Sequence, residues 1–241
     1  MPLPKINTPT YELVLPSSGK KIKYRPFLVR EEKILIMALE TEDQKQITRA
    51  VIDILSSCII TKGIKLDKLA TFDIEYLFLN VRSKSVGEQI EVNVTCPDDE
   101  KTSVPITIDI DSIKIEKNKK HTNIVKLDDS LSLKLRYPSM EQFISTNFES
   151  AEESGNEIKT TLDMIISCID NIFNDEESWP ASESTKKELG EFLDQLNTKQ
   201  FKMIEDFFAT MPKLTHTLKV KNPKTNVEST VKLEGLASFF T

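Results

Sequence analysis

The chain has 241 residues, of which 39% are hydrophobic and 29% are charged, and only 6 are glycine. This composition is typical of a globular, helix-rich protein with a buried core, and it excludes an intrinsically disordered chain. The formal net charge of −6 argues against general nucleic-acid binding, which needs a basic excess or a basic stripe.

The sequence shows no secretory signal and no apolar run long enough to cross a bilayer. Its 3 cysteines lie far apart, so a disulfide framework is not indicated. We therefore expect a soluble protein of a reducing compartment, in the cytosol or in an assembly built there.

The first segment, residues 1–87, predicts a β-hairpin followed by three helices. Apolar and polar residues alternate on both sides of a turn at 16–19, which is typical of a hairpin. Pro26 ends the second strand, and the next residues predict a helix whose inward face carries Leu28, Leu35, Ile36 and Leu39.

Two further helices follow in this segment. Thr41 and Gln44 have the spacing of a capping box at the start of the second helix. The third helix begins near Thr71, with Asp73 in its first turn, where the helix dipole favours acids. We expect its inward face to carry Ile74, Leu77, Phe78 and Val81.

The second segment, residues 88–137, is β-rich and predicts a small β-hairpin subdomain. The third, residues 138–241, returns to helices and ends in a second hairpin. In it, Ser139 and Gln142 predict a capping box, and residues 158–172 predict a helix. Helices near 185–196 and 199–209 precede the C-terminal hairpin. The fold class predicted from these segments is α+β.

The stretch "TCPDD" in the second segment has the shape of half a zinc knuckle. Cys96 and Pro97 occupy the first positions, but Asp99 stands where a second thiolate would be needed. Structural zinc takes four ligands, normally thiolates and imidazoles in closely spaced pairs. Cys58 and Cys168 lie on apolar helical stripes and are expected in the core. We therefore predict a hairpin that is degenerate zinc-ribbon-like, with no metal and no other cofactor.

No catalytic motif is recognisable. The sequence lacks Gly-x-Ser-x-Gly and any glycine-rich loop for phosphate, and neither histidine lies in a motif. A short basic stretch has no interleaved aromatic residues that could stack on bases, so it is interpreted as a solvated loop: Lys114, Lys117, Lys119, Lys120 and His121. We predict a protein that is not an enzyme and has neither a small-molecule substrate nor a nucleic-acid partner.

Two stretches are richer in apolar and aromatic residues than a solvated surface requires. Tyr24, Arg25 and Phe27 lie at the junction of strand and first helix, where they form either a structural corner or a partner contact. The chain ends in Leu236, Phe239 and Phe240, which must dock either on the protein's own core or on another subunit. These six residues are the candidate partner-binding residues.

The same stretches resemble a known family. The segments that carry the likeness span nearly the whole chain in order: "KYRPFLVREEK", "DIEYLFLNVRSKSVGE", "TCP", "MPKLTHTL", "NPKT" and "VKLEGLASFF". Together they are similar to the baseplate hub and hub-assembly proteins of T-even-like contractile-tailed bacteriophages. In relatives the two hairpins can carry paired cysteines, whereas here Cys96 stands alone and Asn222 and Asn226 lie in the second turn.

The resemblance implies a non-enzymatic role in building the phage tail. Its partners would be other baseplate hub proteins, with self-association as a further expectation. The protein would act in the host cytoplasm during assembly, and it would either stay in the virion baseplate or leave as a transient chaperone. The alternative from a different class is a regulatory binding module with a degenerate zinc ribbon, acting on a nucleic-acid machine.

Overall fold

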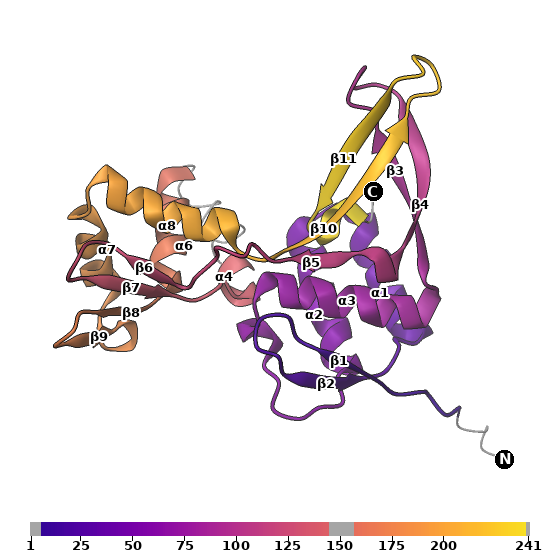
Figure 1. Cartoon of the computed structure of the whole chain (residues 1–241). Helices are drawn as coiled ribbons and strands as arrows, with labels where there is room; N and C mark the ends of the chain where they lie inside the picture. The colour runs from indigo at the N-terminus through magenta and orange to yellow at the C-terminus, as the bar shows by residue number, and fades with distance from the viewer. Residues whose placement is uncertain (1–5, 145–156, 240–241) are drawn as a thin grey trace. The chain divides into compact units, whose positions relative to one another are not determined.

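The computed structural model describes residues 6–144 and 157–239 (Figure 1). Contacts within the chain divide it into two compact units. Unit 1 is formed by Met1–Leu66, Phe72–Glu116 and Lys213–Thr241, and unit 2 by Asp67–Thr71 and Lys117–Pro212.

This grouping differs from a division along the sequence. The strands just after residue 88 belong to unit 1, together with the C-terminal hairpin, whereas the strands between residues 117 and 212 belong to unit 2. The three segments 1–87, 88–137 and 138–241 therefore do not coincide with spatial units, and their role as separate folding units stays a prediction.

Unit 1 opens with a hairpin, as predicted. Strands β1 (Tyr11–Val14) and β2 (Lys21–Tyr24) pair antiparallel. Gly19 closes their turn with a φ of +69°, a conformation that a residue with a Cβ rarely adopts. The turn is tied to the third helix because Ser17 donates from both its backbone N–H and its hydroxyl to the carboxylate of buried Asp73.

Helices α1 (Val29–Glu40), α2 (Gln44–Cys58) and α3 (Thr71–Val86) follow. The predicted inward face of α3 is confirmed, since its four apolar residues are fully buried. The capping box predicted for α2 is wrong. Asp43 is the N-cap, and its Oδ1 accepts from the N–H of Lys45 at 2.8 Å and of Gln46 at 3.3 Å. The hydroxyl of Thr41 instead donates to the carbonyl of Ala38 at 2.7 Å, at the end of α1.

Two long hairpins complete unit 1. Strands β3 (Gln89–Thr95) and β4 (Ser103–Asp109) form one, and β10 (Lys213–Lys221) and β11 (Glu228–Glu234) form the other, to which β5 (Lys114–Glu116) adds at the β10 edge. Figure 1 shows the two hairpins side by side with their turns at the same end. Alternation of apolar and polar residues gives each strand one face that packs against a common set of buried residues, so the two hairpins share one core.

Unit 2 is built on a four-stranded antiparallel sheet in the order β6-β7-β8-β9. Its strands are β6 (Ile124–Lys126), β7 (Ser132–Leu135), β8 (Ile169–Phe173) and β9 (Ser178–Pro180). Its helices are α4 (Met140–Ile144), α6 (Glu157–Cys168), α7 (Lys186–Asp194) and α8 (Thr198–Thr210).

One helix of unit 2 is shorter than its pattern predicts. The helix expected over 158–172 ends at Cys168, and Ile169 and Ile172 lie in β8. Ile172 is paired with Leu133 of β7 on one side and with Trp179 of β9 on the other. Isoleucine is stiff at χ1 and packs well on a pleated surface, so pairing within the sheet overrides the helical spacing.

Other local predictions are confirmed. In the capping box at α4 the N–H of Ser139 donates to Gln142 Oε1 at 2.8 Å, and the N–H of Gln142 donates to Ser139 Oγ at 3.2 Å. Helices α7 and α8 lie where the apolar spacing predicts them. The mixed α+β class is confirmed, while the zinc-ribbon-like character of the hairpins stays a prediction.

Candidate partner-binding surfaces

The corner between β2 and α1 is held by the chain's own contacts. Tyr24 and Phe27 are only 3% and 7% exposed. The N–H of Arg25 donates to the carbonyl of Cys58 at 3.0 Å, and the N–H of Phe27 donates to Ser85 Oγ at 2.9 Å. In the single chain these residues therefore form a structural corner. A contact between them and a partner stays a prediction.

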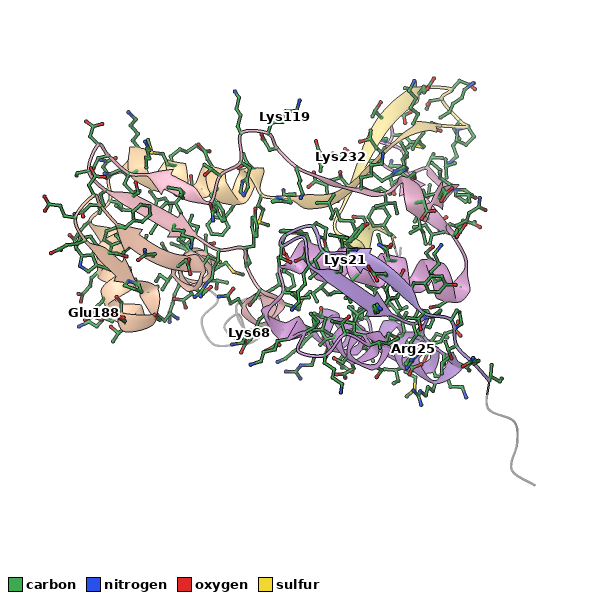
Figure 2. All side chains as sticks on the ribbon, turned by 60° about the horizontal axis from the view of Figure 1, so that its bottom comes forward. Lys21, Arg25, Lys68, Lys119, Glu188 and Lys232 are labelled. Atoms are coloured by element: carbon green, nitrogen blue, oxygen red, sulfur yellow. The ribbon has the colours of Figure 1, made fainter. Side chains whose placement is uncertain are left out.

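Arg25, labelled in Figure 2, clamps this corner through its guanidinium. Its two terminal nitrogens donate to the carbonyl of Pro26 at 2.8 Å, to the carbonyl of Ser57 at 2.9 Å and to Glu31 Oε1 at 3.0 Å. Glu31 Oε2 in turn accepts from the N–H of Leu28 at 2.7 Å, at the first residue before α1. One arginine thus joins the ends of β2 and α2 to the start of α1.

Glu31 is the buried partner in this clamp. Burial would raise the pKa of its carboxyl, but hydrogen bonds from Arg25 and Arg30 and from the N–H of Leu28 outweigh it and lower the pKa to about 2. The carboxylate is therefore ionised at neutral pH and stays bound to its arginines. These hydrogen bonds from the arginines also explain why a charged residue lies on the inward face of α1.

The inward face predicted for α1 is wrong for most of its residues. Leu35 is buried as expected, but the rest of that face is made by Glu31 and Ala38. The other three residues predicted inward are exposed, namely Leu28, which directly precedes α1, and Ile36 and Leu39. Three more apolar residues of α1 are also exposed: Val29, Ile34 and Met37. The sequence carried a signal for this exposure, because apolar residues occur on more than one side of the helix "VREEKILIMALE".

This exposed surface of α1 is the strongest candidate for a protein contact. Val29, Ile36 and Met37 are 66%, 50% and 67% exposed, and all three belong to a helix of 12 residues. Single exposed apolar residues are common, but several on one face of a short helix are typical of a protein interface. We call Val29, Ile36 and Met37 the α1 patch.

The C-terminal residues divide between described and undescribed parts of the chain. Phe239 is buried in the core shared by the two long hairpins, so of the two alternatives it docks on the protein's own core. The side chain of Leu236 and all of Phe240 lie outside the described residues. A partner contact by these two residues stays a prediction.

The turns of the two long hairpins have the same backbone pattern. In each, a residue followed by proline accepts at its carbonyl from the N–H four residues later, from Glu100 to Cys96 and from Asn226 to Asn222, both at 2.9 Å. Glu100 and Asn226 both have positive φ, 53° and 60°. The two turns therefore share one backbone conformation at these positions.

Polar side chains link these two turns. The Nδ2 of Asn222 and the hydroxyl of Thr225 donate to Asp98, while Asp99 accepts from the N–H and the hydroxyl of Thr102. Hydrogen bonds from Thr225 and Asn222 lower the pKa of Asp98, so it is ionised at neutral pH. Within residues 6–144 and 157–239, no three histidine, cysteine, aspartate or glutamate side chains gather so as to hold a metal ion.

The cysteines are buried thiols. Burial raises the pKa of Cys58 and of Cys168 to about 11, and it also raises the pKa of Cys96. A thiol with such a pKa is protonated at neutral pH and is a poor nucleophile. This agrees with the core positions predicted for Cys58 and Cys168.

His121 lies in a loop of unit 2 as predicted, but its ring packs in an aromatic cluster and is not fully solvated. Its ring stacks on Tyr137 with centroids 5.6 Å apart and lies 5.0 Å from the ring of Phe207. Its Nδ1 lies 3.0 Å from Thr210 Oγ1 and its Nε2 lies 3.1 Å from the hydroxyl of Tyr137. Burial lowers the pKa of His121, which favours the neutral ring.

The outer face of the β11-β10-β5 sheet carries ion pairs. Lys232, labelled in Figure 2, pairs with Glu116 at 2.8 Å and with Glu234 at 3.1 Å, and Lys213 pairs with Glu234 at 3.5 Å. This face is charged and internally paired, and so it is less suited to an apolar partner than the α1 patch.

Comparisons with known proteins bear on the class of protein. A family model described as T4 bacteriophage base plate protein matches residues 8–241. No curated protein and no solved structure matches the chain. None of the described helices is long and apolar enough to cross a membrane. Because the family match covers nearly the whole chain, this protein belongs to the T4 bacteriophage base plate protein family, a family with a structural role in the phage tail among other baseplate proteins.

Proposed function

We propose that this protein is a subunit or assembly factor of the baseplate hub and that it acts through protein–protein contacts, without catalysis. The family match supports a place among baseplate proteins. The observation that carries the contact function is the α1 patch, three strongly exposed apolar side chains on one short helix. A partner that covers these side chains removes apolar surface from water, which lowers the free energy of the complex.

The predicted anchors have an indirect role in this proposal. Tyr24, Arg25 and Phe27 fix the corner from which α1 starts, and they therefore set how the patch is presented. Phe239 anchors the C-terminal segment on the core of unit 1. Direct partner contact is proposed for Leu236 and Phe240.

The test is co-purification from infected cells with mass spectrometry of two samples. One sample is finished particles, and the other is whatever is bound to this protein during assembly. Presence in both supports a permanent hub subunit, and presence only with intermediates supports an assembly factor. Absence from both overturns the hub proposal.

The contribution of the patch is tested with a matched pair of variants. Ile36→Gln adds polarity at the patch without disfavouring the helix, because glutamine is a good helix former. Val86→Gln is the control, since Val86 is also an exposed helical residue of unit 1, at 57% exposure. We expect Ile36→Gln to reduce recovery of baseplate partners at least ten-fold and Val86→Gln to leave it unchanged.

The regulatory-module alternative has no specific observation in its favour. The turns that would form a degenerate zinc ribbon are joined by Asp98, Asn222 and Thr225 through hydrogen bonds. The hub proposal is therefore the one we retain.

A further inference from the structure

Two charged residues beside the α1 patch, Lys33 and Glu40, are not compensated within their own helix. Lys33 has Val29, Arg30, Ile36 and Met37 as its neighbours three and four residues away, so no acid faces it, and Arg30 is a like charge. Glu40 has Ile36 and Met37 in the corresponding positions of α1. No ion pair joins Lys33 or Glu40 to another residue in the described part of the chain.

Glu40 also opposes the dipole of the helix, because it is an acid in the last turn. The start of a helix favours acids and its end favours bases, and α1 has no base in its last turn. Arg30 and Lys33 lie in the first half of the exposed surface, and Glu40 lies at its end. From Lys33 through Ile36 and Met37 to Glu40 the exposed face is thus basic, apolar and acidic in order, and neither side-chain pairing nor the dipole within one copy accounts for this order.

The same order is self-complementary between two antiparallel helices. We propose that α1 packs against α1 of a second copy of this chain, related to it by a two-fold axis near Ile36 and Met37. Ile36 of each copy then faces Met37 of the other, and Lys33 of each copy lies beside Glu40 of the other. This inference rests on the proposed function of the α1 patch as a contact surface, and it identifies a second copy of the chain as the partner that covers the patch.

The two-fold arrangement has the expected anatomy of an interface. The apolar pair occupies the centre and the two Lys33–Glu40 pairs flank it, so the charges remain at the rim. A parallel pair would set Lys33 beside Lys33 and Glu40 beside Glu40, which is repulsive. Antiparallel packing also aligns the two helix dipoles favourably. Charge complementarity therefore selects both the partner and the direction.

The area available limits the affinity. A helix of 12 residues is about 18 Å long and covers less than the roughly 800 Å² per partner of a standard interface. We therefore expect a weak dimer, with a dissociation constant on the order of 10⁻⁵ to 10⁻⁴ M. Such a dimer forms only when the local concentration of the chain is high.

Sedimentation equilibrium of the full chain over a concentration series tests the proposal. The expected mass rises from 27.5 kDa toward twice that value with increasing concentration. Ile36→Gln is expected to weaken association at least ten-fold, and the control Val86→Gln to leave it unchanged. A wild-type chain that stays monomeric over the whole series overturns the dimer.

Charge reversal gives the sharper test. Lys33→Glu and Glu40→Lys should each weaken association at least ten-fold, and the double variant, which keeps the net charge, should restore it to within about three-fold. Glu40→Lys also improves the agreement with the helix dipole, because it places a base in the last turn of α1. Loss of association in this variant is therefore not expected to arise from unfolding of the helix.

The outcomes separate this inference from the proposed function. If the dimer forms but its dissociation constant is unchanged by Ile36→Gln and by the charge reversals, the dimer uses another surface and the α1 pairing is overturned. A monomeric wild type, with Ile36→Gln still losing baseplate partners, overturns the dimer and leaves the hub proposal standing. Dimerisation as expected, with absence from particles and intermediates, supports the dimer and overturns the hub proposal.

Discussion

The Nδ2 of Asn222 donates to both carboxylate oxygens of Asp98, at 3.1 and 3.0 Å, across 124 residues of sequence. Asn222 is fully buried, and its own Oδ1 accepts from the N–H of Lys224 at 2.8 Å. One side chain therefore closes its own turn and ties it to the turn of the other hairpin. Side-chain hydrogen bonds thus join the ends of the two long hairpins.

The Asn222–Asp98 contact predicts coupled effects on stability. Asn222→Ala should lower the free energy of unfolding by about 1–3 kcal/mol, because buried turn groups lose their hydrogen-bond partners. Asp98→Ala should give a smaller loss. The double variant should cost more than Asn222→Ala, because the hydrogen bond from Thr225 to Asp98 is lost as well, but less than the sum of the two single changes, because their shared interaction is lost only once. Urea denaturation of the three variants measures the coupling.

A neighbouring surface residue provides the control for this cycle. Lys224→Ala changes a side chain on the same turn, exposed to solvent, and should alter stability by less than about 0.5 kcal/mol. Strict additivity of the Asn222 and Asp98 changes would contradict the link between the turns.

The Arg25 clamp predicts that a conservative change is costly. Arg25→Lys keeps the positive charge but cannot reach Pro26, Ser57 and Glu31 together, because lysine lacks the planar fork. We expect the free energy of unfolding to fall by about 2–3 kcal/mol. Arg30→Ala is the control, since its side chain is 72% exposed, and should cost about 0.5 kcal/mol. Equal effects of the two changes in thermal denaturation would be evidence against the clamp.

The clamp also predicts a dependence on acid pH. The pKa of Glu31 is lowered from 4.5 to about 2 in the folded chain. Its contribution to stability is therefore complete above about pH 4.5 and is lost as the pH falls toward 2. Glu31→Gln should be less stable than the wild type at pH 7, and the difference should shrink between pH 4.5 and pH 2. A difference independent of pH would contradict this.

His121 predicts a second pH effect with the same sign. The hydroxyl of Thr210 donates to the carbonyl of Asp206 at 2.7 Å, so its oxygen accepts from Nδ1–H of His121, and Nε2 accepts from Tyr137. Burial lowers the pKa of His121 below 6.5 and so favours this neutral ring. The contribution of neutral His121 to the free energy of unfolding is therefore complete above pH 6.5, and it is lost as the pH falls through and below that value.

The measurement compares unfolding at pH 7.5 and pH 5.5 for wild type and His121→Gln. We expect the variant to lose part of the pH dependence, because a glutamine does not titrate. The assignment fails if His121→Gln retains the full pH dependence of the wild type.

Phe239 predicts that the last described residue of the chain contributes to the core. Phe239→Ala should lower the free energy of unfolding by about 3–4 kcal/mol, because it removes a buried ring from the core of unit 1. Val227→Ala, at an exposed apolar position of the second long turn, is the control and should cost less than about 0.5 kcal/mol. A small effect of Phe239→Ala would mean that the C-terminal segment is not anchored on this core.

Local signals in the sequence identified most elements. Alternation located β1, β2, β3 and the two hairpins, and the spacing of three and four located α3, α7 and α8, because each pattern reflects which face of an element avoids water. The capping box of Ser139 and Gln142 was readable because it lies within four residues. Cys58 and Cys168 were assigned to the core for the same reason as their apolar neighbours.

The failures occurred where distant residues decided the outcome. The helix pattern over 158–172 did not show that Ile169 and Ile172 would pair with β7 and β9. The inward face of α1 was wrong because Glu31 is drawn inward by Arg25, a partner outside the helix. His121 was expected to be solvated because its stacking partners Tyr137 and Phe207 lie elsewhere in the chain.

By itself the sequence determined the class of fold, most element positions and the family resemblance, because these depend on periodicity and on residues read in order. The tertiary structure alone decided which apolar side chains stay exposed. Whether Ile36 or Phe239 is buried depends on what the rest of the chain packs against it, and periodicity contains no such information. The α1 patch, the link between Asp98 and Asn222 and the corner held by Arg25 all follow from such long-range packing.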